Sequence, residues 1–360
     1  MDTRSDPAIA FDADGRCDRC RAQVARLAEW HERGHSGGAE ALTARVRAAG
    51  RSSRYDIIIG LSGGGDSCLM VYLAKKLGLR VLAVHMDNGW DTAVSVRNVK
   101  RIVEALDVDY ESFVLDWDEF RDLQLAFFRA SVPEIETPTD MAIPGALHRV
   151  AVRHGVKYIA FGSNLLNEGM TPPHWHYNRK DLKFLRAVHD RFGTTELRYF
   201  PSFGYREEAY FKLVKGIRII YPLRFISYTQ EEAASTLRSL GWQPAGGKHY
   251  ESVITRFVQS YVLPTKFGFD YRYPTLSAQI CCGAITRESA LAQLEDPSID
   301  PDLLQSDKDY VAKKFGLTTE ELDRIIALPP RTYADYPNDL AFLQGVYSLY
   351  RHYVALREPG

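Results

Sequence analysis

Short apolar runs alternate with helical stretches through the middle of the chain. Residues 56–61 (DIIIGL) are almost continuously β-branched or apolar, which is typical of a strand buried on both faces of a parallel sheet. Similar runs lie at residues 80–85, 110–115, 157–161 and 216–221, and helical patterns lie between them at 68–77, 95–106 and 146–154. This alternation predicts βαβ units and therefore an α/β fold with a doubly wound parallel sheet.

The segments on either side of this region are helical in pattern. Residues 21–34 predict one helix, and a second short helix follows, ending at about residue 50. After residue 222, helical patterns lie at residues 229–240, 250–263, 287–294, 318–326 and 339–355. We therefore predict three parts, with the sheet in the second: residues 1–50, 51–225 and 226–360.

Composition and charge narrow the class of protein. The 45 Lys and Arg residues almost balance 46 Asp and Glu residues, and a net charge of −1 argues against a nucleic-acid partner or a membrane surface. The sequence has no apolar run of about 18 residues and no signal-peptide pattern at residues 1–15. The spacing of the five cysteines fits reduced thiols. We expect a soluble cytoplasmic protein.

A glycine-rich loop joins the first predicted strand to the next helix. Its residues are Ser62, Gly63, Gly64, Gly65, Asp66 and Ser67. Glycines let backbone N–H groups turn toward an anion, the helix N-terminus adds positive potential, and the Asp66 carboxylate suits Mg²⁺. The loop lacks both the G-K-[ST] ending of a Walker A motif and the G-x-G-x-x-G of a dinucleotide loop. It is therefore a phosphate site of another type or, alternatively, a turn without a ligand.

The order S-G-G-x-D-S after a buried strand resembles the signature of the PP-loop ATP pyrophosphatases. This superfamily includes asparagine, GMP and NAD synthetases and tRNA thiolation enzymes. The resemblance implies that ATP is cleaved between its α and β phosphates, that AMP is transferred to a substrate oxygen, and that pyrophosphate leaves through the loop. A nucleophile, usually ammonia or a sulfur donor, then displaces AMP.

Further segments make the chain resemble the N-acetyl sugar amidotransferases of bacterial surface-polysaccharide (lipopolysaccharide, O-antigen) biosynthesis. They lie, in order, at residues 11–20, 62–67, 85–90, 137–140, 162–164, 246–252 and 267–270. The resemblance implies that ATP activates the N-acetyl oxygen of a nucleotide-linked sugar and that ammonia then gives an acetamidino group. Because an amide oxygen leaves poorly, adenylation is chemically necessary, with Mg²⁺ and cationic groups near the leaving pyrophosphate.

Residues after the second and fourth strands are candidates for binding ATP. His85, Met86 and Asp87 follow the second strand, and Gly162 follows the fourth. Ligands of open parallel sheets collect at these carboxyl ends, so we assign all four residues to ATP. An ordinary strand-to-helix loop is the alternative for the first three.

Five residues are candidates for binding the sugar nucleotide. They are Asp140, Asn164, Glu168, Arg179 and Lys180. The first three lie around later crossovers and would otherwise cap helices. The last two begin a basic cluster, which is either a site for the diphosphate of the sugar nucleotide or a solvated face.

A compact K-H-x-E sequence follows two glycines near the start of a predicted helix. We assign Lys248, His249 and Glu251, together with Asp66, to catalysis. Lys248 would neutralise phosphate charge, because the glycine-rich loop contains no lysine, and His249 would act as a base or orient ammonia. A polar helix N-terminus is the alternative.

Cys17 and Cys20 have the spacing of half a tetrahedral zinc site. Members of the family resembled here usually carry a second C-x2-C upstream, which this sequence lacks, so either the start is truncated or the ligands have changed. Cys281 and Cys282 would complete four thiolates, but adjacent cysteines suit one ion poorly. Zinc at Cys17 and Cys20 is therefore a possible, not a required, feature.

The positions of the cysteines indicate that this chain does not produce its own ammonia from glutamine. Residue 2 is Asp, and no cysteine lies in a G-x-C-x-G context, so we expect no glutaminase activity in this chain and a separate glutaminase subunit as partner. Two other functions stay open: a tRNA sulfur-insertion enzyme built on the same loop, and a non-catalytic adenine-nucleotide-binding protein.

Overall fold

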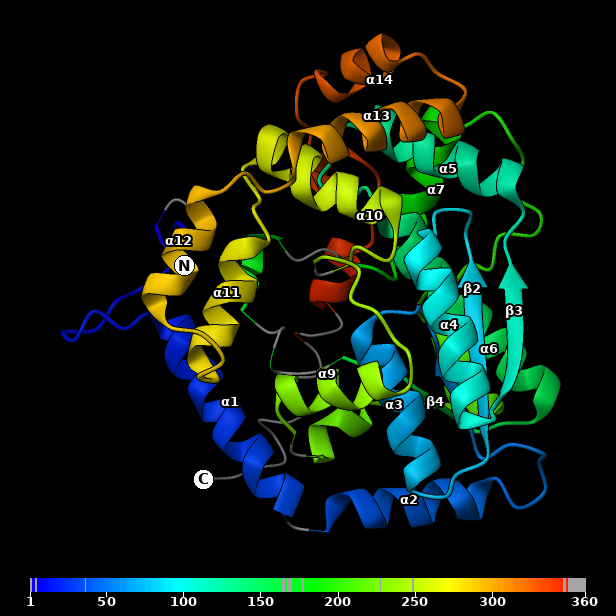
Figure 1. The fold of residues 1–360 in the computed structure, drawn as a ribbon. Helices are drawn as coiled ribbons and strands as arrows, with labels where there is room; N and C mark the ends of the chain where they lie inside the picture. Colours follow the sequence, from blue (N-terminus) through cyan, green and yellow to red (C-terminus); the bar gives the residue numbers. More distant parts are fainter. Residues whose placement is uncertain are drawn as a thin grey trace.

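The fold is built on a five-stranded parallel sheet, which lies to the right in Figure 1. The computed structural model describes residues 2–3, 5–35, 37–163, 166, 170–175, 178–226, 228–247, 249–345 and 348. The strand order is β3-β2-β1-β4-β5. The strands are β1 (Ile57–Gly60), β2 (Val81–Asp87), β3 (Asp109–Val114), β4 (Tyr158–Ala160) and β5 (Arg218–Ile220). All five predicted strands are present, and the doubly wound α/β fold is confirmed.

Helices account for most of the remaining described chain. The α-helices are α1 (Asp18–His35), α2 (Gly38–Ala49), α3 (Gly65–Lys76), α4 (Ala93–Leu106), α5 (Trp117–Ala130), α6 (Thr137–His154), α7 (Leu182–Phe192), α8 (Tyr205–Ala209), α9 (Gln230–Ser239), α10 (Val253–Phe257), α11 (Arg272–Cys281), α12 (Arg287–Glu295), α13 (Pro301–Phe315) and α14 (Thr319–Ile326). Short 3₁₀ segments are η1 (Pro173–Trp175), η3 (Pro222–Phe225) and η5 (Tyr333–Asp335), and η2 (Tyr210–Val214) and η4 (Val258–Phe267) are π-helical. Among the described residues, no helix is both long and apolar enough to cross a membrane.

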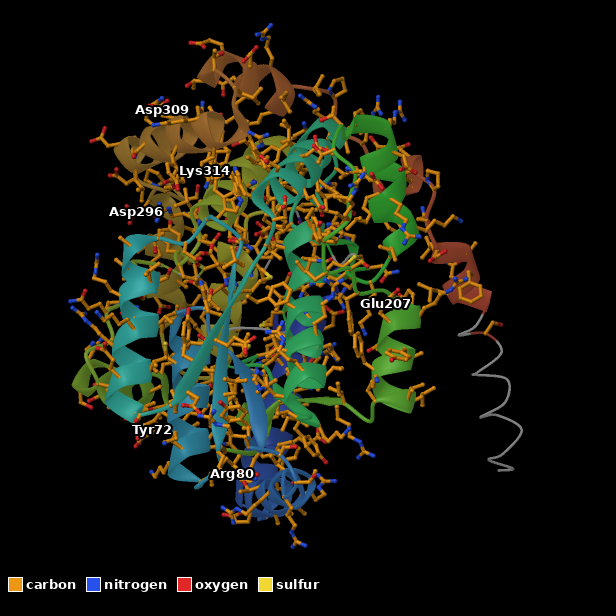
Figure 2. The ribbon with its side chains drawn as sticks, turned by 90° about the vertical axis from the view of Figure 1, so that its right-hand side faces the viewer. Tyr72, Arg80, Glu207, Asp296, Asp309 and Lys314 are labelled. Atoms are coloured by element: carbon orange, nitrogen blue, oxygen red, sulfur yellow. The ribbon has the colours of Figure 1, made fainter. Side chains whose placement is uncertain are left out.

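Alternate residues of the central strand face two different layers of helices. Ile57 and Ile59 pack in a core with α2, α3 and α4, whereas Ile58 packs in a second core with α6. Both layers are therefore needed to bury β1, which explains its continuous apolar sequence. Figure 2 shows Arg80, just before β2, and Lys314 of α13 at opposite ends of the sheet.

A third core lies beyond the carboxyl ends of β2 and β3 (Figure 1). It joins α5 and α7 to helices of the C-terminal third, α10, α13 and α14. The predicted helical character of residues 226–360 therefore agrees with the structure, and these helices share one core with helices that follow the sheet strands. The predicted division at residue 225 stays a prediction.

Several predicted helices differ from those in the structure. The helix expected at residues 250–263 begins at Val253 and continues from Val258 as the π-helix η4, which accommodates Pro264. The helix expected at 339–355 is present over residues 340–345, and most of the rest lies outside the described residues. Helices α5, α7, α11 and α13 were not predicted.

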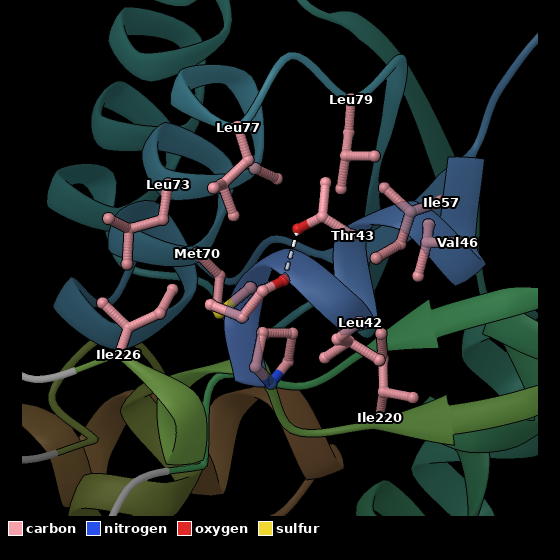
Figure 3. A pocket seen from close by; sticks show the side chains of 13 residues that line it. Leu42, Thr43, Val46, Ile57, Met70, Leu73, Leu77, Leu79, Ile220 and Ile226 are labelled. Atoms are coloured by element: carbon pink, nitrogen blue, oxygen red, sulfur yellow. Dashed lines mark hydrogen bonds between the residues drawn. The ribbon is translucent and has the colours of Figure 1, made fainter. Parts of the chain in front are cut away.

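A small apolar cavity of about 20 Å³ lies between α2, α3 and the sheet. Its lining includes Leu42, Val46, Ile57 and Met70 (Figure 3). The hydroxyl of Thr43, on the same lining, donates to the Ala39 carbonyl within α2. A space of this size holds about one water molecule and offers no polar group to a ligand, so it is a packing gap.

The buried ion pair between α10 and α13 should dominate the stability of the C-terminal core. Arg256 donates to both oxygens of Asp307 at 2.7 and 2.6 Å, and the Asp307 side chain is 4% exposed. Asp307→Ala would leave a buried guanidinium unpaired, and we expect the free energy of unfolding to fall by about 3–5 kcal/mol. Urea denaturation measures this change. As a control, Glu196→Ala breaks an exposed pair with Arg198 and should cost less than about 1 kcal/mol; equal losses would contradict the assignment.

Candidate functional site

The Ser62–Ser67 loop leads from the end of β1 into the first turn of α3. The Ser67 hydroxyl donates to the Gly64 carbonyl at 3.0 Å and accepts a hydrogen bond from the Ser62 N–H at 3.2 Å. The Ser62 and Ser67 hydroxyls lie 3.1 Å apart, and Ser62 is exposed. The loop therefore presents two adjacent hydroxyls and the N-terminus of a helix to solvent, which is the arrangement that an anion requires.

Close packing fixes the path of this loop. Gly63 has φ +83°, and a Cβ on it would lie 2.4 Å from the Ser95 carbonyl oxygen. A Cβ on Gly162 would lie 2.9 Å from the Asp66 carbonyl oxygen, so the segment after β4 passes directly beside the loop. Gly162, which was assigned to ATP from the sequence, therefore lies next to the Ser62–Ser67 loop.

Two residues that were not predicted from the sequence, Trp242 and Asn98, fix the loop by hydrogen bonds to its backbone. The Trp242 indole N–H and the Asn98 amide donate to the Gly63 carbonyl at 2.9 and 3.1 Å. Asn98 also exchanges two hydrogen bonds with the backbone of Gln243. The segment after α9 and the start of α4 therefore hold the loop in place, although no motif marks either residue.

The segment before α10 places Glu251 against the Ser62–Ser67 loop. Its backbone is held by the Thr92 N–H, which donates to the Glu251 carbonyl at 2.9 Å. A Cβ on Gly64 would lie 2.7 Å from Glu251 Oε1, and His249 Nδ1 lies 3.9 Å from the same oxygen. Two of the residues predicted to be catalytic, His249 and Glu251, are therefore together beside the loop. Lys248 lies outside the described residues.

His85 connects the loop to a cavity between α4 and the strands β2 and β3. Its Nδ1 is 2.8 Å from the Leu61 carbonyl oxygen, and its Nε2 is 3.0 Å from Asp91 Oδ2. Burial opposes protonation, but the hydrogen bond and charge of Asp91, together with the Leu61 carbonyl, outweigh it and raise the pKa of His85. We therefore expect the ring to keep a proton on both nitrogens up to a higher pH than an exposed histidine does.

The cavity beside His85 has a volume of about 490 Å³, which is large enough for a nucleoside. Asp87 and Tyr110 line it, and Asp87 Oδ1 also accepts the Gly89 N–H at 2.9 Å. The Met86 side chain instead packs against the core of the C-terminal helices. Of the three predicted ATP residues at the end of β2, His85 and Asp87 therefore line the cavity, and Met86 does not.

Several acidic side chains at the start of α6 lie near His249. We define the acid cluster as Glu134, Glu136 and Asp140, at the N-terminus of α6, around Tyr271. Gln259 donates to Glu136 at 2.8 Å. Burial, followed by the charge of Asp140, raises the pKa of Glu136, and burial with the neighbouring carboxylates raises that of Tyr271 to about 12.

The structure brings some of the predicted sugar-binding residues together and places others elsewhere. Arg179 Nε lies 3.3 Å from Asp140 Oδ2, so this predicted pair is brought together at the acid cluster. Lys180 points to Glu208 of α8, with 2.6 Å between Nζ and Oε1. Asn164 and Glu168 lie outside the described residues. Glu134, Glu136 and Tyr271 were not predicted.

Two protein-family models match separate parts of the chain. Residues 56–145, which contain the Ser62–Ser67 loop, match the family described as queuosine biosynthesis protein QueC. Residues 251–350 match the family described as LPS biosynthesis protein WbpG-like, C-terminal domain. The chain therefore combines a QueC-like PP-loop domain with a WbpG-like C-terminal domain. No curated protein sequence matches it.

Solved structures similar to this PP-loop protein include two synthetases. NMN synthetase from Francisella tularensis has 12% identity to this chain and a TM-score of 0.34. The match covers 77% of this chain and 92% of the synthetase chain. NH3-dependent NAD synthetase from Campylobacter jejuni has 15% identity and a TM-score of 0.33. This match covers 79% of the present chain and 94% of the synthetase chain. A predicted subunit of tRNA methyltransferase from Methanocaldococcus jannaschii has 16% identity and a TM-score of 0.29. This match covers 51% of the present chain and 75% of that subunit. At these scores, the fold assignment rests on the strand order and loop described above.

The thiols of three cysteines, Cys17, Cys20 and Cys281, lie together where α1 meets α11. The Cys17 and Cys20 sulfurs lie 3.0 Å apart, and a hydrogen bond between Cys20 and Cys281 raises the pKa of Cys20 and lowers that of Cys281. Sulfur atoms on one zinc ion stand farther apart than 3.0 Å because each Zn–S bond is about 2.3 Å long. Among the described residues, no three His, Cys, Asp or Glu side chains are arranged to hold a metal, so the zinc site stays a prediction.

Glu134 should make the stability of the protein depend on pH. Burial raises its pKa to about 7, whereas an unfolded glutamate titrates near 4.5. The folded state therefore binds more protons between these values, and the free energy of unfolding should fall by about 3 kcal/mol from pH 4.5 to pH 7. Urea denaturation at several pH values measures this slope. Glu134→Gln should flatten it and the exposed Glu288→Gln should not; an unchanged slope in Glu134→Gln would exclude Glu134 as the cause.

Proposed function

We propose that this PP-loop protein transfers AMP from ATP to the N-acetyl oxygen of a nucleotide-linked sugar and then replaces that oxygen with ammonia. One observation carries the proposal. Glu251, the first residue of the WbpG-like region, lies against Gly64 of the Ser62–Ser67 loop. In this proposal the WbpG-like region would therefore contribute a carboxylate to the pyrophosphate site. The products would be an acetamidino sugar, AMP and pyrophosphate.

In this proposal the loop binds the departing pyrophosphate. The N-terminus of α3 and the hydroxyls of Ser62 and Ser67 stabilise the charge that develops when the bond between the α and β phosphates breaks. Glu251 and Asp66 are carboxylates beside an anion site, and such groups repel phosphate unless a cation lies between them. They would hold Mg²⁺, which would neutralise the pyrophosphate, and Lys248 would add a further positive charge.

The remaining residues would position the two substrates. The cavity beside His85 and Asp87 would take the adenosine, and Gly162, which packs directly against the Asp66 backbone, would lie next to the α-phosphate. Asp140 and Arg179, with Asn164, Glu168 and Lys180, would bind the sugar nucleotide. His249 lies between these two regions and would accept the proton that the nitrogen loses.

Ammonia would come from a separate glutaminase subunit in the cytoplasm. Such a partner would deliver ammonia directly, which prevents its protonation and loss to solvent. The purified chain should therefore use ammonium salts but not glutamine. Glutamine hydrolysis by the chain alone would contradict this part of the proposal.

Mass spectrometry tests the proposed reaction. The chain is incubated with ATP, Mg²⁺, ammonium chloride and a panel of UDP- and CMP-linked diacetamido sugars. Replacement of the amide oxygen by NH lowers the neutral mass of the sugar by about one unit, and AMP should form in equal amount. AMP formation that depends on tRNA instead would favour a sulfur-insertion enzyme, and binding of ATP without any turnover would favour a nucleotide-binding protein.

A further inference from the structure

We propose that the hydrogen-bonded pair of His85 and Asp91 positions the Glu251 carboxylate at the Ser62–Ser67 loop. The affinity of the loop for magnesium pyrophosphate then depends on the protonation of His85. This inference rests on the proposed function, in which the loop holds the departing pyrophosphate. It makes Asp91 a positioning residue and gives His85 a role beyond lining the cavity.

Both ring nitrogens of His85 face groups that accept hydrogen bonds. Nδ1 lies 2.8 Å from the Leu61 carbonyl oxygen, and Nε2 lies 3.0 Å from Asp91 Oδ2. A neutral histidine donates from one nitrogen only, whereas the protonated ring donates from both. The His85 and Asp91 side chains are 9% and 17% exposed, so water reaches this pair poorly. Protonated His85 therefore ties Asp91 to the residue directly before the loop.

The backbone around Asp91 is paired with the segment that carries Glu251. Residues 90–92 and 251–253 form an antiparallel bridge with two backbone hydrogen bonds, both of 2.9 Å. Glu251 Oε1 lies 2.7 Å from the position of a Cβ on Gly64, in the loop itself. A movement of Asp91 would therefore move the carboxylate that faces the loop.

The residue after Asp91 connects the same segment to a second glycine of the loop. The Thr92 hydroxyl accepts the Ser95 N–H at 3.3 Å at the start of α4, and the Ser95 carbonyl oxygen would lie 2.4 Å from a Cβ on Gly63. On the other side of Asp91, Trp90 is fully buried against aromatic rings of α5 and α13. The segment around Asp91 is thus fixed in the core and packs against the loop at both Gly63 and, through Glu251, Gly64.

Asp91 is the carboxylate that keeps the His85 ring charged. The other titratable groups that line the cavity are Asp87 on β2, Lys100 and Glu104 on α4, and Tyr110 on β3. Lys100 and Glu104 are mostly exposed and lie 3.9 Å apart, so their charges largely cancel at the ring. Burial raises the pKa of Tyr110, which stays uncharged near neutral pH. Burial opposes protonation of His85, but the hydrogen bond and charge of Asp91 outweigh it and raise the pKa of the ring.

Loss of the proton from His85 should loosen the contact between Asp91 and the loop. A neutral ring donates to only one of its two acceptors, so the other acceptor faces a nitrogen lone pair. Because the pKa of His85 is raised in the folded protein, the pair is complete below the ordinary histidine value of about 6.5 and is lost as the pH rises through the raised pKa. The affinity for magnesium pyrophosphate should fall over the same range.

Calorimetric titration of the full chain with magnesium pyrophosphate at several pH values tests the inference. Asp91→Ala should weaken binding about tenfold below the pKa of His85. The amide of Asp91→Asn can donate to Nε2 of a neutral ring, so this variant should restore the affinity and lose the pH dependence that His85 causes. Pyrophosphate itself titrates equally in both experiments, so the difference between the unmodified protein and Asp91→Asn isolates His85. If Asp91→Ala does not fold, this difference still decides the outcome.

Glu111→Gln is the matched control. It removes another histidine–carboxylate pair, in which His154 Nε2 lies 2.6 Å from Glu111 Oε2 between α6 and β3, and it should leave pyrophosphate binding unchanged. Nitrogen NMR of the His85 ring gives an independent measurement and should show two protonated nitrogens at about pH 6.

These measurements separate the inference from the proposed function. A pH dependence that is the same in the unmodified protein and in Asp91→Asn would overturn the inference, and so would a neutral His85 ring at about pH 6. In either case, turnover of a sugar nucleotide would leave the function standing. Pyrophosphate binding that follows the titration of His85, with no turnover on any sugar nucleotide, would support the inference and overturn the function.

Discussion

Asp66→Ala should reduce ATP-dependent AMP formation by on the order of a thousandfold. Asp66 lies in the first turn of α3, beside Gly162 and within the Ser62–Ser67 loop. Without its carboxylate the site loses a ligand for the cation that neutralises the leaving pyrophosphate, so the transition state should be affected more than the ground state. Pyrophosphate release measured under saturating ATP reports this loss.

The fold should survive this substitution. An acidic residue near a helix N-terminus contributes only about 0.3–1 kcal/mol to stability. Asp118→Ala is the matched control, because Asp118 also lies in the first turn of a helix, α5, and its side chain is 76% exposed. It should lose comparable stability and keep full activity. Pyrophosphate release by Asp66→Ala at the normal rate would contradict the role assigned to Asp66.

Gly63→Ala should strongly weaken the binding of ATP and of pyrophosphate. At φ +83° an alanine is strained, and its Cβ would lie 2.4 Å from the Ser95 carbonyl oxygen, which belongs to the backbone of α4. The loop or the first turn of α4 must therefore move. We expect the affinity for pyrophosphate to fall by on the order of a hundredfold and the free energy of unfolding to fall by about 3 kcal/mol. Calorimetric titration and urea denaturation measure these two quantities.

Gly216 is a control that separates the effect of the steric clash from the effect of the backbone strain. Gly216 has a similar φ of +67°, but a Cβ on it would have no atom within 4 Å among the described residues. Gly216→Ala should therefore cost only about 1–2 kcal/mol for the left-handed conformation and leave pyrophosphate binding intact. If Gly63→Ala bound pyrophosphate as well as Gly216→Ala does, the close packing of the loop would have no role in binding.

The sheet and its phosphate loop were predictable because both depend on local sequence. A strand buried on both faces has to be continuously apolar, as residues 57–59 are, and a loop that turns N–H groups toward an anion has to be rich in glycine. The helices α5 and α7 also had local signals that were overlooked. Asp116 and Asp181 cap them by accepting the backbone N–H of Glu119 and Phe184.

The surroundings of the loop were not predictable in the same way. Trp242 and Asn98 meet at the Gly63 carbonyl, and the acid cluster joins Glu136 to Gln259 and Tyr271 from a distant part of the chain. These contacts depend on how the C-terminal helices pack against α5 and α7. Spacing within one segment carries no information about such packing.

A crystal structure with Mg²⁺ and an ATP analogue that resists cleavage between the α and β phosphates tests the central claim most directly. The account predicts that the β and γ phosphates contact the N-terminus of α3 and the hydroxyls of Ser62 and Ser67, with the adenosine in the cavity beside His85. A triphosphate bound elsewhere, with no phosphate at the Ser62–Ser67 loop, would contradict it.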